Sequence, residues 1–239
     1  MKTILHKAET RGHANHGWLD SWHSFSFGSY YDPSRIHFGA LRVLNDDTVA
    51  PGMGFGKHPH DNMEIISIAL EGELEHADNM GNQQVIRKGD VQVMSAGTGI
   101  IHSEKNKNND QFVKFLQIWV FPNKRNVQPR YDQKTFNEED KQNKLTTVLS
   151  PVGANDGGVQ IHQEAWFSLG KLDQGVELSY NLKKKNNGVY VFAIEGDVTI
   201  NEILMNRRDG LGITEVDQLR IVAGSEAEIL LMEVPMQVS

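Results

Sequence analysis

The sequence predicts an all-β protein composed of two similar β domains. Short apolar runs follow one another with turn-forming residues between them, which is typical of a sandwich or barrel rather than of alternating strands and helices. One stretch of the first half also recurs in the second half, as internal repeats do. At 239 residues, the chain is long enough for one large domain or two small ones, with a sizeable core in either case.

The expected strands in the first half follow from apolar runs bounded by turns. They are residues 38–44, 64–70, 74–77, 84–86, 91–94 and 112–121. The turn at residues 78–82 joins two of these runs into a hairpin. One short helix is expected around residues 137–142, and it is polar enough to link two domains. We therefore expect an N-terminal domain at 1–136, a linker at 137–144 and a C-terminal domain at 145–239.

The internal repeat is clearest around two glycines. Residues 65–72, Ile-Ile-Ser-Ile-Ala-Leu-Glu-Gly, resemble residues 189–196, Val-Tyr-Val-Phe-Ala-Ile-Glu-Gly. In each copy a turn-rich stretch then leads to a second glycine–aspartate pair, at residues 89–90 and at residues 209–210. This similarity predicts two domains of the same kind.

Composition excludes several classes of function. The chain is 38% hydrophobic and 23% charged, as in ordinary globular proteins, and its formal net charge of -7 argues against nonspecific binding to nucleic acid or anionic membrane. It has no cysteine, which excludes disulfides, thiolate nucleophiles and cysteine-based metal sites. No signal peptide is recognised, and no apolar run approaches the ~20 residues that span a bilayer. We expect a cytoplasmic monomer.

Two short motifs predict a metal site. His58 and His60 are separated by one residue, so on a strand their imidazoles would project from the same face. His102 and Glu104 repeat this spacing with an imidazole and a carboxylate. If the two strands face each other across a barrel, four ligands converge. Three neutral nitrogens and one oxygen suit a divalent transition metal.

The neighbouring residues strengthen this interpretation, because a lone His-x-His is usually an ordinary polar pair. Glycine-rich turns at 52–56 and 97–99 adjoin the motifs and would let backbone approach a cavity closely. Alignment on the repeated glycines tests the second half for ligands. The residues that replace the two motifs there are Leu182, Lys184, Ala223 and Ser225. Only the first half is therefore expected to bind metal.

Residues 10–31 are rich in aromatic residues and histidine. His13 and His16 have a spacing that could bind metal on a helix, but the flanking glycines favour a loop. We expect a loop without metal, packed by Trp18, Trp22, Phe25 and Phe27. His23 and His37 are likewise expected to be structural.

Two longer motifs show a family resemblance. The first cupin motif, G-x5-H-x-H-x3-E-x6-G, is matched, with one extra residue before its last glycine, by Gly52, His58, His60, Glu64 and Gly72. In the second motif Gly89 and Gly97 fit, Ser95 replaces the proline, and His102 comes two residues late. The late histidine within Ser-Ala-Gly-Thr-Gly-Ile-Ile-His-Ser-Glu resembles the form found in the pirin family of the cupin superfamily. The resemblance is strong over residues 10–135 and weak in the second half.

The resemblance implies a bicupin, in which two antiparallel β-barrels (double-stranded β-helices) pack face to face and one metal lies in the N-terminal barrel. The implied metal ligands are His58, His60, His102 and Glu104. Other cupins use the glutamate of the first motif, here Glu64, and spacing alone does not choose between the two carboxylates. Fe(II) is the first choice of metal, and Mn, Ni, Cu, Co or Zn would also suit these ligands.

The function that the resemblance implies is that of bacterial pirin-like quercetin 2,3-dioxygenases. Such an enzyme opens the central ring of a flavonol with O2 and releases CO. Glu104 would accept the proton of the substrate's 3-hydroxyl, and Phe and Trp side chains from residues 18–38 would line the mouth of the barrel. One alternative is a non-enzymatic, redox-sensing regulator that binds a protein partner. Another is a structural metal with a closed shell.

Overall fold

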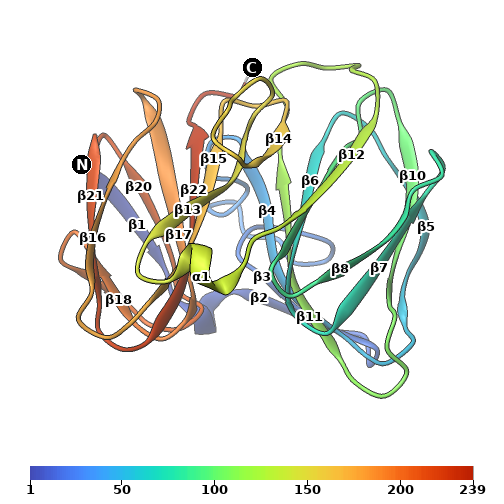
Figure 1. The fold of residues 1–239 in the computed structure, drawn as a ribbon, viewed down its shortest axis with the longest axis horizontal. Coiled ribbons are helices and arrows are strands. Elements are labelled where there is room, and N and C mark those ends of the chain that lie inside the picture. The colour runs from blue at the N-terminus through green and yellow to red at the C-terminus, as the bar shows by residue number, and fades with distance from the viewer. Residues whose placement is uncertain (239) are drawn as a thin grey trace.

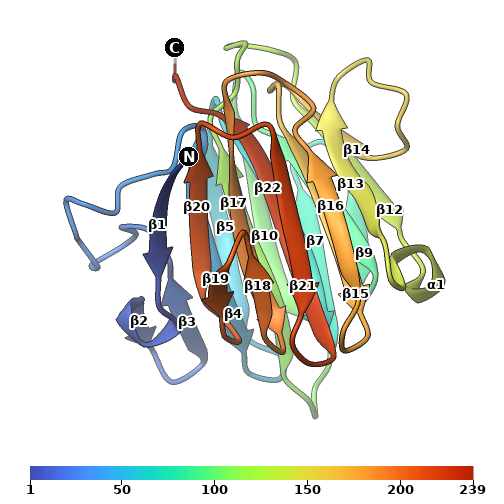
Figure 2. The ribbon, with the colours of Figure 1, turned by 90° about the vertical axis from the view of Figure 1, so that its left-hand side faces the viewer.

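The computed structural model describes residues 1–238, which form four β-sheets arranged as four successive layers (Figure 1). Each half of the structure has one seven-stranded and one four-stranded sheet, and the first strand of the chain belongs to the large sheet of the C-terminal half. Every strand pair is antiparallel except β13–β14, which is parallel. Seen from the C-terminal half, the strands of successive layers run in nearly the same direction (Figure 2), as in aligned sheet packing.

The N-terminal half contains the two sheets that surround the candidate site. Its large sheet has the order β12 (Arg130–Thr135), β9 (Asp90–Ser95), β6 (Glu64–Glu71), β11 (Val113–Val120), β4 (Leu41–Val49), β3 (Leu19–His23) and β2 (Gly12–Asn15). Its small sheet has the order β5 (Gly54–His60), β10 (Ile100–Asn106), β7 (Glu73–Asp78) and β8 (Gln83–Arg87).

The C-terminal half repeats this pattern. Its large sheet has the order β1 (Lys2–His6), β20 (Gly210–Thr214), β17 (Asn187–Glu195), β22 (Ala227–Pro235), β15 (Trp166–Leu172), β13 (Leu145–Pro151) and β14 (Val159–Ile161). Its small sheet has the order β16 (Glu177–Asn181), β21 (Gln218–Ala223), β18 (Val198–Ile200) and β19 (Ile203–Met205).

The bicupin expected from the resemblance is present, with one refinement. Each half is a two-sheet sandwich of the jelly-roll type, and its strands do not close into a hydrogen-bonded barrel. The hairpin predicted around residues 78–82 is confirmed as β7–β8. The loop predicted for residues 10–31 is wrong in part, because β2 and β3 pair there and extend the large sheet. Alternation is weak in this histidine-rich stretch, so the sequence did not reveal two strands.

The two large sheets pack face to face, and the side chains between them form the largest apolar core, to which both halves contribute. Alternation along a strand produces this arrangement, because successive side chains point to opposite faces. On β17, Tyr190, Phe192 and Ile194 enter this shared core. The alternate residues Val189, Val191 and Ala193 fill the interior of the C-terminal half.

The first strand crosses from one half to the other. β1 pairs with β20, and Lys7 and the backbone N–H of Ala8 both donate to the buried carboxylate of Asp209. A division of the chain at 137–144 therefore leaves β1 in the sheet of the C-terminal half. The boundaries at 136 and 145 otherwise stay a prediction.

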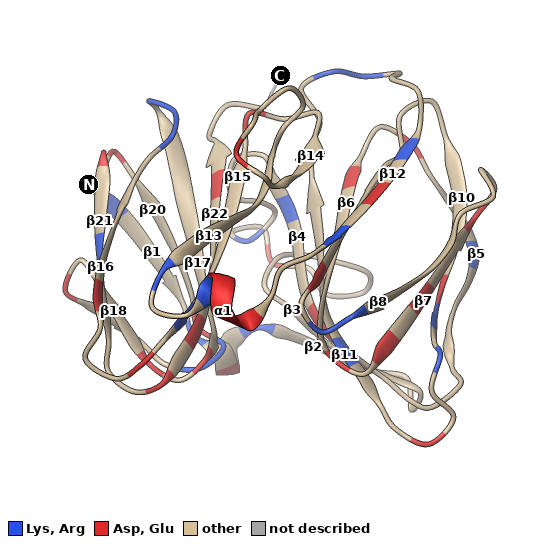
Figure 3. Cartoon of the chain, viewed as in Figure 1, with Lys and Arg blue, Asp and Glu red and all other residues tan. Residues whose placement is uncertain are grey.

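The short helix expected around residues 137–142 is confirmed as α1 (Glu138–Lys141), and a 3-10 turn, η1 (Ala8–Thr10), follows β1. Among residues 1–238, no helix has the length and apolar character needed to cross a membrane. Acidic and basic residues are interspersed over both halves (Figure 3).

Candidate metal centre

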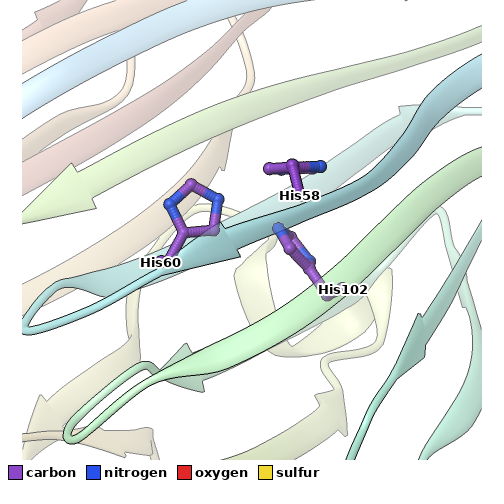
Figure 4. Close-up of side chains that lie close together, drawn as sticks. All are labelled: His58, His60 and His102. Atoms are coloured by element: carbon purple, nitrogen blue, oxygen red, sulfur yellow. The ribbon is translucent and has the colours of Figure 1, made fainter.

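Three histidines gather on the inner side of the small N-terminal sheet. His58 and His60 project from β5, and His102 projects from β10 toward both of them (Figure 4). One nitrogen from each ring lies within 4.8 Å of the others. Among residues 1–238, this is the one group of three or more potential ligands that lies so close together. The predicted grouping is therefore present for the three imidazoles, whereas Glu104, the expected fourth ligand, is not a member of this group.

The way in which the strands bring them together differs from the prediction. β5 and β10 are hydrogen-bonded neighbours in one sheet, with His102 directly opposite His58, and do not face each other across a barrel. Opposed side chains on neighbouring strands lie close enough to share a ligand. A register shift between His102 and Glu104 then places Glu104 opposite Phe55.

Two of the histidines each have one ring nitrogen that could bind a metal. His58 Nδ1 lies 2.7 Å from the carbonyl oxygen of Gly56, which can only accept, so the proton is on Nδ1 and Nε2 is free. His102 is 2% exposed, and its Nε2 has no hydrogen-bond partner. A buried nitrogen without a partner costs free energy, and a metal ion would satisfy it.

Behind His102, two further side chains, His76 and Asp78, continue a row of hydrogen-bonded groups. The Nδ1 of His102 is 3.5 Å from Nδ1 of His76, and Nε2 of His76 is 3.1 Å from a carboxylate oxygen of Asp78. Burial alone would raise the pKa of Asp78, but hydrogen bonds from Asn82 and His76 hold it below its usual value. The ionised carboxylate accepts from His76 Nε2, so His76 Nδ1 accepts from His102 Nδ1. This leaves the lone pair of His102 on Nε2.

Burial keeps two of the histidines, His60 and His102, in the form that can bind metal. Desolvation, helped by His58, lowers the pKa of His60 to about 4. Desolvation, followed by repulsion from His58, His60 and His76, lowers the pKa of His102 to about 2. Neutral imidazole is the form that coordinates a metal.

The two candidate carboxylates lie in different surroundings. Glu104 is buried, and its oxygens accept from Gln117 Nε2 at 2.7 Å and from Ser67 Oγ at 3.2 Å. Burial raises the pKa of Glu104. Glu64 instead accepts from Ser95 Oγ at 2.6 Å, and burial raises its pKa to about 7. Only Glu104 lines the same cavity as His58 and His60.

That cavity has a volume of about 580 Å³, within the range of small-molecule sites. Its aromatic lining consists of Trp18, Phe27, Phe55 and Trp119, together with histidines. The expected aromatic mouth from residues 18–38 is therefore present in Trp18 and Phe27. Phe25 and Phe38 lie instead in the core between the large sheets, because their side chains point to the other face.

Sequence reasoning missed a polar row that crosses the inner face of the large sheet. Its members lie opposite one another on successive strands: Gln133, Gln92, Ser67, Gln117, Asn45 and His23. The central pair, Ser67 and Gln117, holds Glu104. The residues are far apart in the chain, so only the strand register reveals the row.

The remaining histidines of the aromatic segment do not join the metal cluster. His13 stacks on Trp22, with ring centroids 4.1 Å apart, and His16 lines the cavity. His23 also lines the cavity, although it was expected to be structural. His37 is structural as expected, with Nδ1 2.8 Å from the Gly39 carbonyl.

The interior of the C-terminal half is filled by apolar side chains. Its central strands point Val191, Leu211, Ile213 and Leu231 into the space between its two sheets. Ala223, which replaces the second motif, is buried in the same core. Among the described residues of this half, no three potential metal ligands lie close together.

Two family models match this chain. The model of the family described as Pirin matches residues 5–120, and that of the quercetinase C-terminal cupin domain matches residues 147–234. The chain is 44% identical to quercetin 2,3-dioxygenase of Escherichia coli strain K12, over 97% of this chain and 98% of the relative. This chain belongs to the pirin family.

Other pirin-family relatives agree. A pirin-like protein of Caulobacter vibrioides is 40% identical, over 93% of this chain and 95% of its own length. The crystal structure of the bacterial pirin YhhW from Escherichia coli in complex with nickel(II) has a TM-score of 0.93 at 42% identity, covering 99% of this chain and 100% of that one. Quercetin 2,3-dioxygenase from Acinetobacter baumannii, at 20% identity and a TM-score of 0.79, supports the fold alone.

Proposed function

We propose that this pirin-family chain is a metal-dependent dioxygenase that opens the central ring of a flavonol such as quercetin, consuming O2 and releasing CO. The observation that carries the proposal is the position of the three-histidine cluster at an aromatic cavity large enough for a flat substrate. The relatives named quercetin 2,3-dioxygenase support it, because they cover nearly the whole chain.

The metal would be held by His58, His60 and His102, with Glu104 as the fourth ligand. In support, the three imidazoles converge, burial lowers the pKa of His60 and of His102, and Nε2 of the buried His102 has no other partner. Fe(II) is our first choice. The same nitrogen and oxygen donors accept Mn, Ni, Cu, Co or Zn, and availability often decides among them.

When bound, the metal would supply Lewis acidity and a template that holds substrate and O2 side by side. The chain's own side chains would bind the substrate, exclude water and accept a proton. Trp18, Phe27 and Trp119 would sandwich the flat rings and exclude water. Glu104 would accept the proton of the substrate's 3-hydroxyl, because it is a buried carboxylate in the same cavity. Gln117 and Ser67 would hold that carboxylate in place.

The test is O2-dependent loss of quercetin by protein that has been stripped of metal and reloaded with iron(II). We expect turnover and release of CO only after reloading, and none from a His58→Ala variant treated in the same way. Absence of turnover with a full complement of bound metal would refute the proposal. It would then favour the alternative of a non-enzymatic, redox-sensing regulator with a protein partner.

A further inference from the structure

A second polar group in the same cavity is not used by the metal centre. Two neighbouring strands, β3 and β4, contribute it, and we name it the β3–β4 cluster: Ser21, His23, Asn45 and Asp47. Ser21 lies opposite Asp47 and His23 lies opposite Asn45, so the four side chains form a compact block. All four are at most 5% exposed and line the cavity together with His58 and His60.

The hydrogen bonds inside the cluster leave two acceptors without a donor. The Ser21 hydroxyl donates to Asp47, so its oxygen accepts from His23 Nε2 at 2.8 Å. The proton of His23 is therefore on Nε2, and its Nδ1 carries a lone pair that has no partner. The side-chain oxygen of Asn45 is also buried without a partner.

Buried hydrogen-bond acceptors without a partner are uncommon and unfavourable, so each of them requires an explanation. Desolvation lowers the pKa of His23 to about 4, so this ring stays neutral and offers its lone pair at physiological pH. The partner that would satisfy both acceptors is a group that donates hydrogen bonds and fits an aromatic cavity. A phenolic hydroxyl donates one hydrogen bond, so two hydroxyls of a polyhydroxylated ring would satisfy both acceptors.

We infer that the β3–β4 cluster is a hydroxyl-recognition subsite, which binds phenolic hydroxyls of the aromatic substrate away from the oxygens that meet the metal. His23 Nδ1 accepts from one hydroxyl and the Asn45 oxygen accepts from a second, and Ser21 with Asp47 holds the His23 ring in the required tautomer. The inference rests on the proposed function, because it places the substrate class in the same cavity. The subsite would make the protein select polyhydroxylated rings over unsubstituted ones.

The experiment compares two ligands and two variants. Quercetin carries several phenolic hydroxyls, whereas 3-hydroxyflavone keeps only the 3-hydroxyl next to the 4-carbonyl. His23→Phe keeps an aromatic ring beside Phe27, whose centroid is 5.4 Å away, and removes the acceptor. Asn45→Leu keeps the side-chain shape and removes the other acceptor. His37→Phe is the matched control, because His37 does not line the cavity.

We expect each variant to lower kcat/KM for quercetin by about 10- to 100-fold and to change that for 3-hydroxyflavone less than about 3-fold. The control should change neither. A second readout does not need turnover: quenching of tryptophan fluorescence in metal-stripped protein, where Trp18 and Trp119 lie in the cavity. The Kd of quercetin should weaken by a similar factor, and that of 3-hydroxyflavone should not.

The outcomes separate the two proposals. If neither ligand is turned over but quercetin binding alone depends on His23 and Asn45, the subsite stands and the dioxygenase proposal fails. Equal losses for both ligands would show a merely structural role and overturn the subsite. Failure of the metal-stripped protein to bind either ligand would also overturn it.

Discussion

His76 gives the sharpest test of how the fold prepares its metal ligands. His76 lies between the Nδ1 of His102 and the carboxylate of Asp78, and it is fully buried. Replacing it with Phe keeps a ring against Tyr131, whose centroid is 4.8 Å away, but removes the acceptor for His102 Nδ1–H. In the metal-bound form His102 must keep its proton on Nδ1, so that buried N–H would have no partner.

The magnitude follows from that lost hydrogen bond. A buried donor left without a partner costs about 1–3 kcal/mol, which corresponds to a roughly 5- to 150-fold change in an equilibrium constant. His76→Phe should therefore weaken metal affinity by roughly 5- to 150-fold, a range that includes the roughly 10- to 100-fold losses usual when the hydrogen-bond partner of a metal ligand is replaced.

The assay is a competition for metal between the protein and a chromophoric chelator. His37→Phe is the control, because the same chemical change outside the site should leave affinity within about 3-fold of the unmodified protein. Far-ultraviolet circular dichroism of the metal-free variant would show that the sheets are retained. An affinity of folded His76→Phe equal to that of the unmodified protein would refute the relay from Asp78 to His102.

Three further predictions follow from the site. His58→Ala or His60→Ala should reduce bound metal from one equivalent to nearly none, as measured by elemental analysis after dialysis; a full equivalent in either variant would refute the ligand assignment. Glu104→Gln should reduce activity more than it reduces metal content. Glu64→Gln should change neither, because the Glu64 carboxylate is hydrogen-bonded to Ser95. The reverse pattern would show that Glu64 is the carboxylate ligand. Burial, aided by Asp46, Glu104 and Asp20, raises the pKa of Asp47 to about 7. The folded state therefore holds a proton that the unfolded state releases near pH 4, and stability should fall as pH rises through this window. The measurement is the free energy of unfolding in urea of the metal-free protein and of its Asp47→Asn variant. Between pH 5 and pH 8, this free energy should fall by about 2–3 kcal/mol more in the unmodified protein than in the variant. Equal falls would contradict the assignment.

Strand periodicity was enough to predict that the three imidazoles lie close together. His58 and His60 share a face on any regular strand, and His102 needs only a second strand at the right place. The apolar runs at residues 64–70 and 91–94 became β6 and β9 with small changes at their ends, because such runs have few alternatives in an all-β protein.

Register could not be predicted in the same way. The prediction placed the two ligand strands on opposite walls, whereas β5 and β10 are neighbours joined by hydrogen bonds. The polar residues that hold Glu104 and line the cavity come from strands separated by many residues, and each looks like an ordinary polar position in isolation. Asn45 and Gln117 acquire a role only because β4 and β11 pair in one particular register.

The crossing of β1 and the core shared by both large sheets suggest that this chain would behave as a split protein. Cut in the linker, each fragment would display a wide apolar sheet, and the C-terminal fragment would also lack the strand that covers β20. An uncovered strand edge beside an apolar face promotes self-association. Mixed together, the two fragments carry complementary faces and a strand that only one of them can donate. We expect such fragments to aggregate when made alone and to reassemble when made together, so metal binding could report their association.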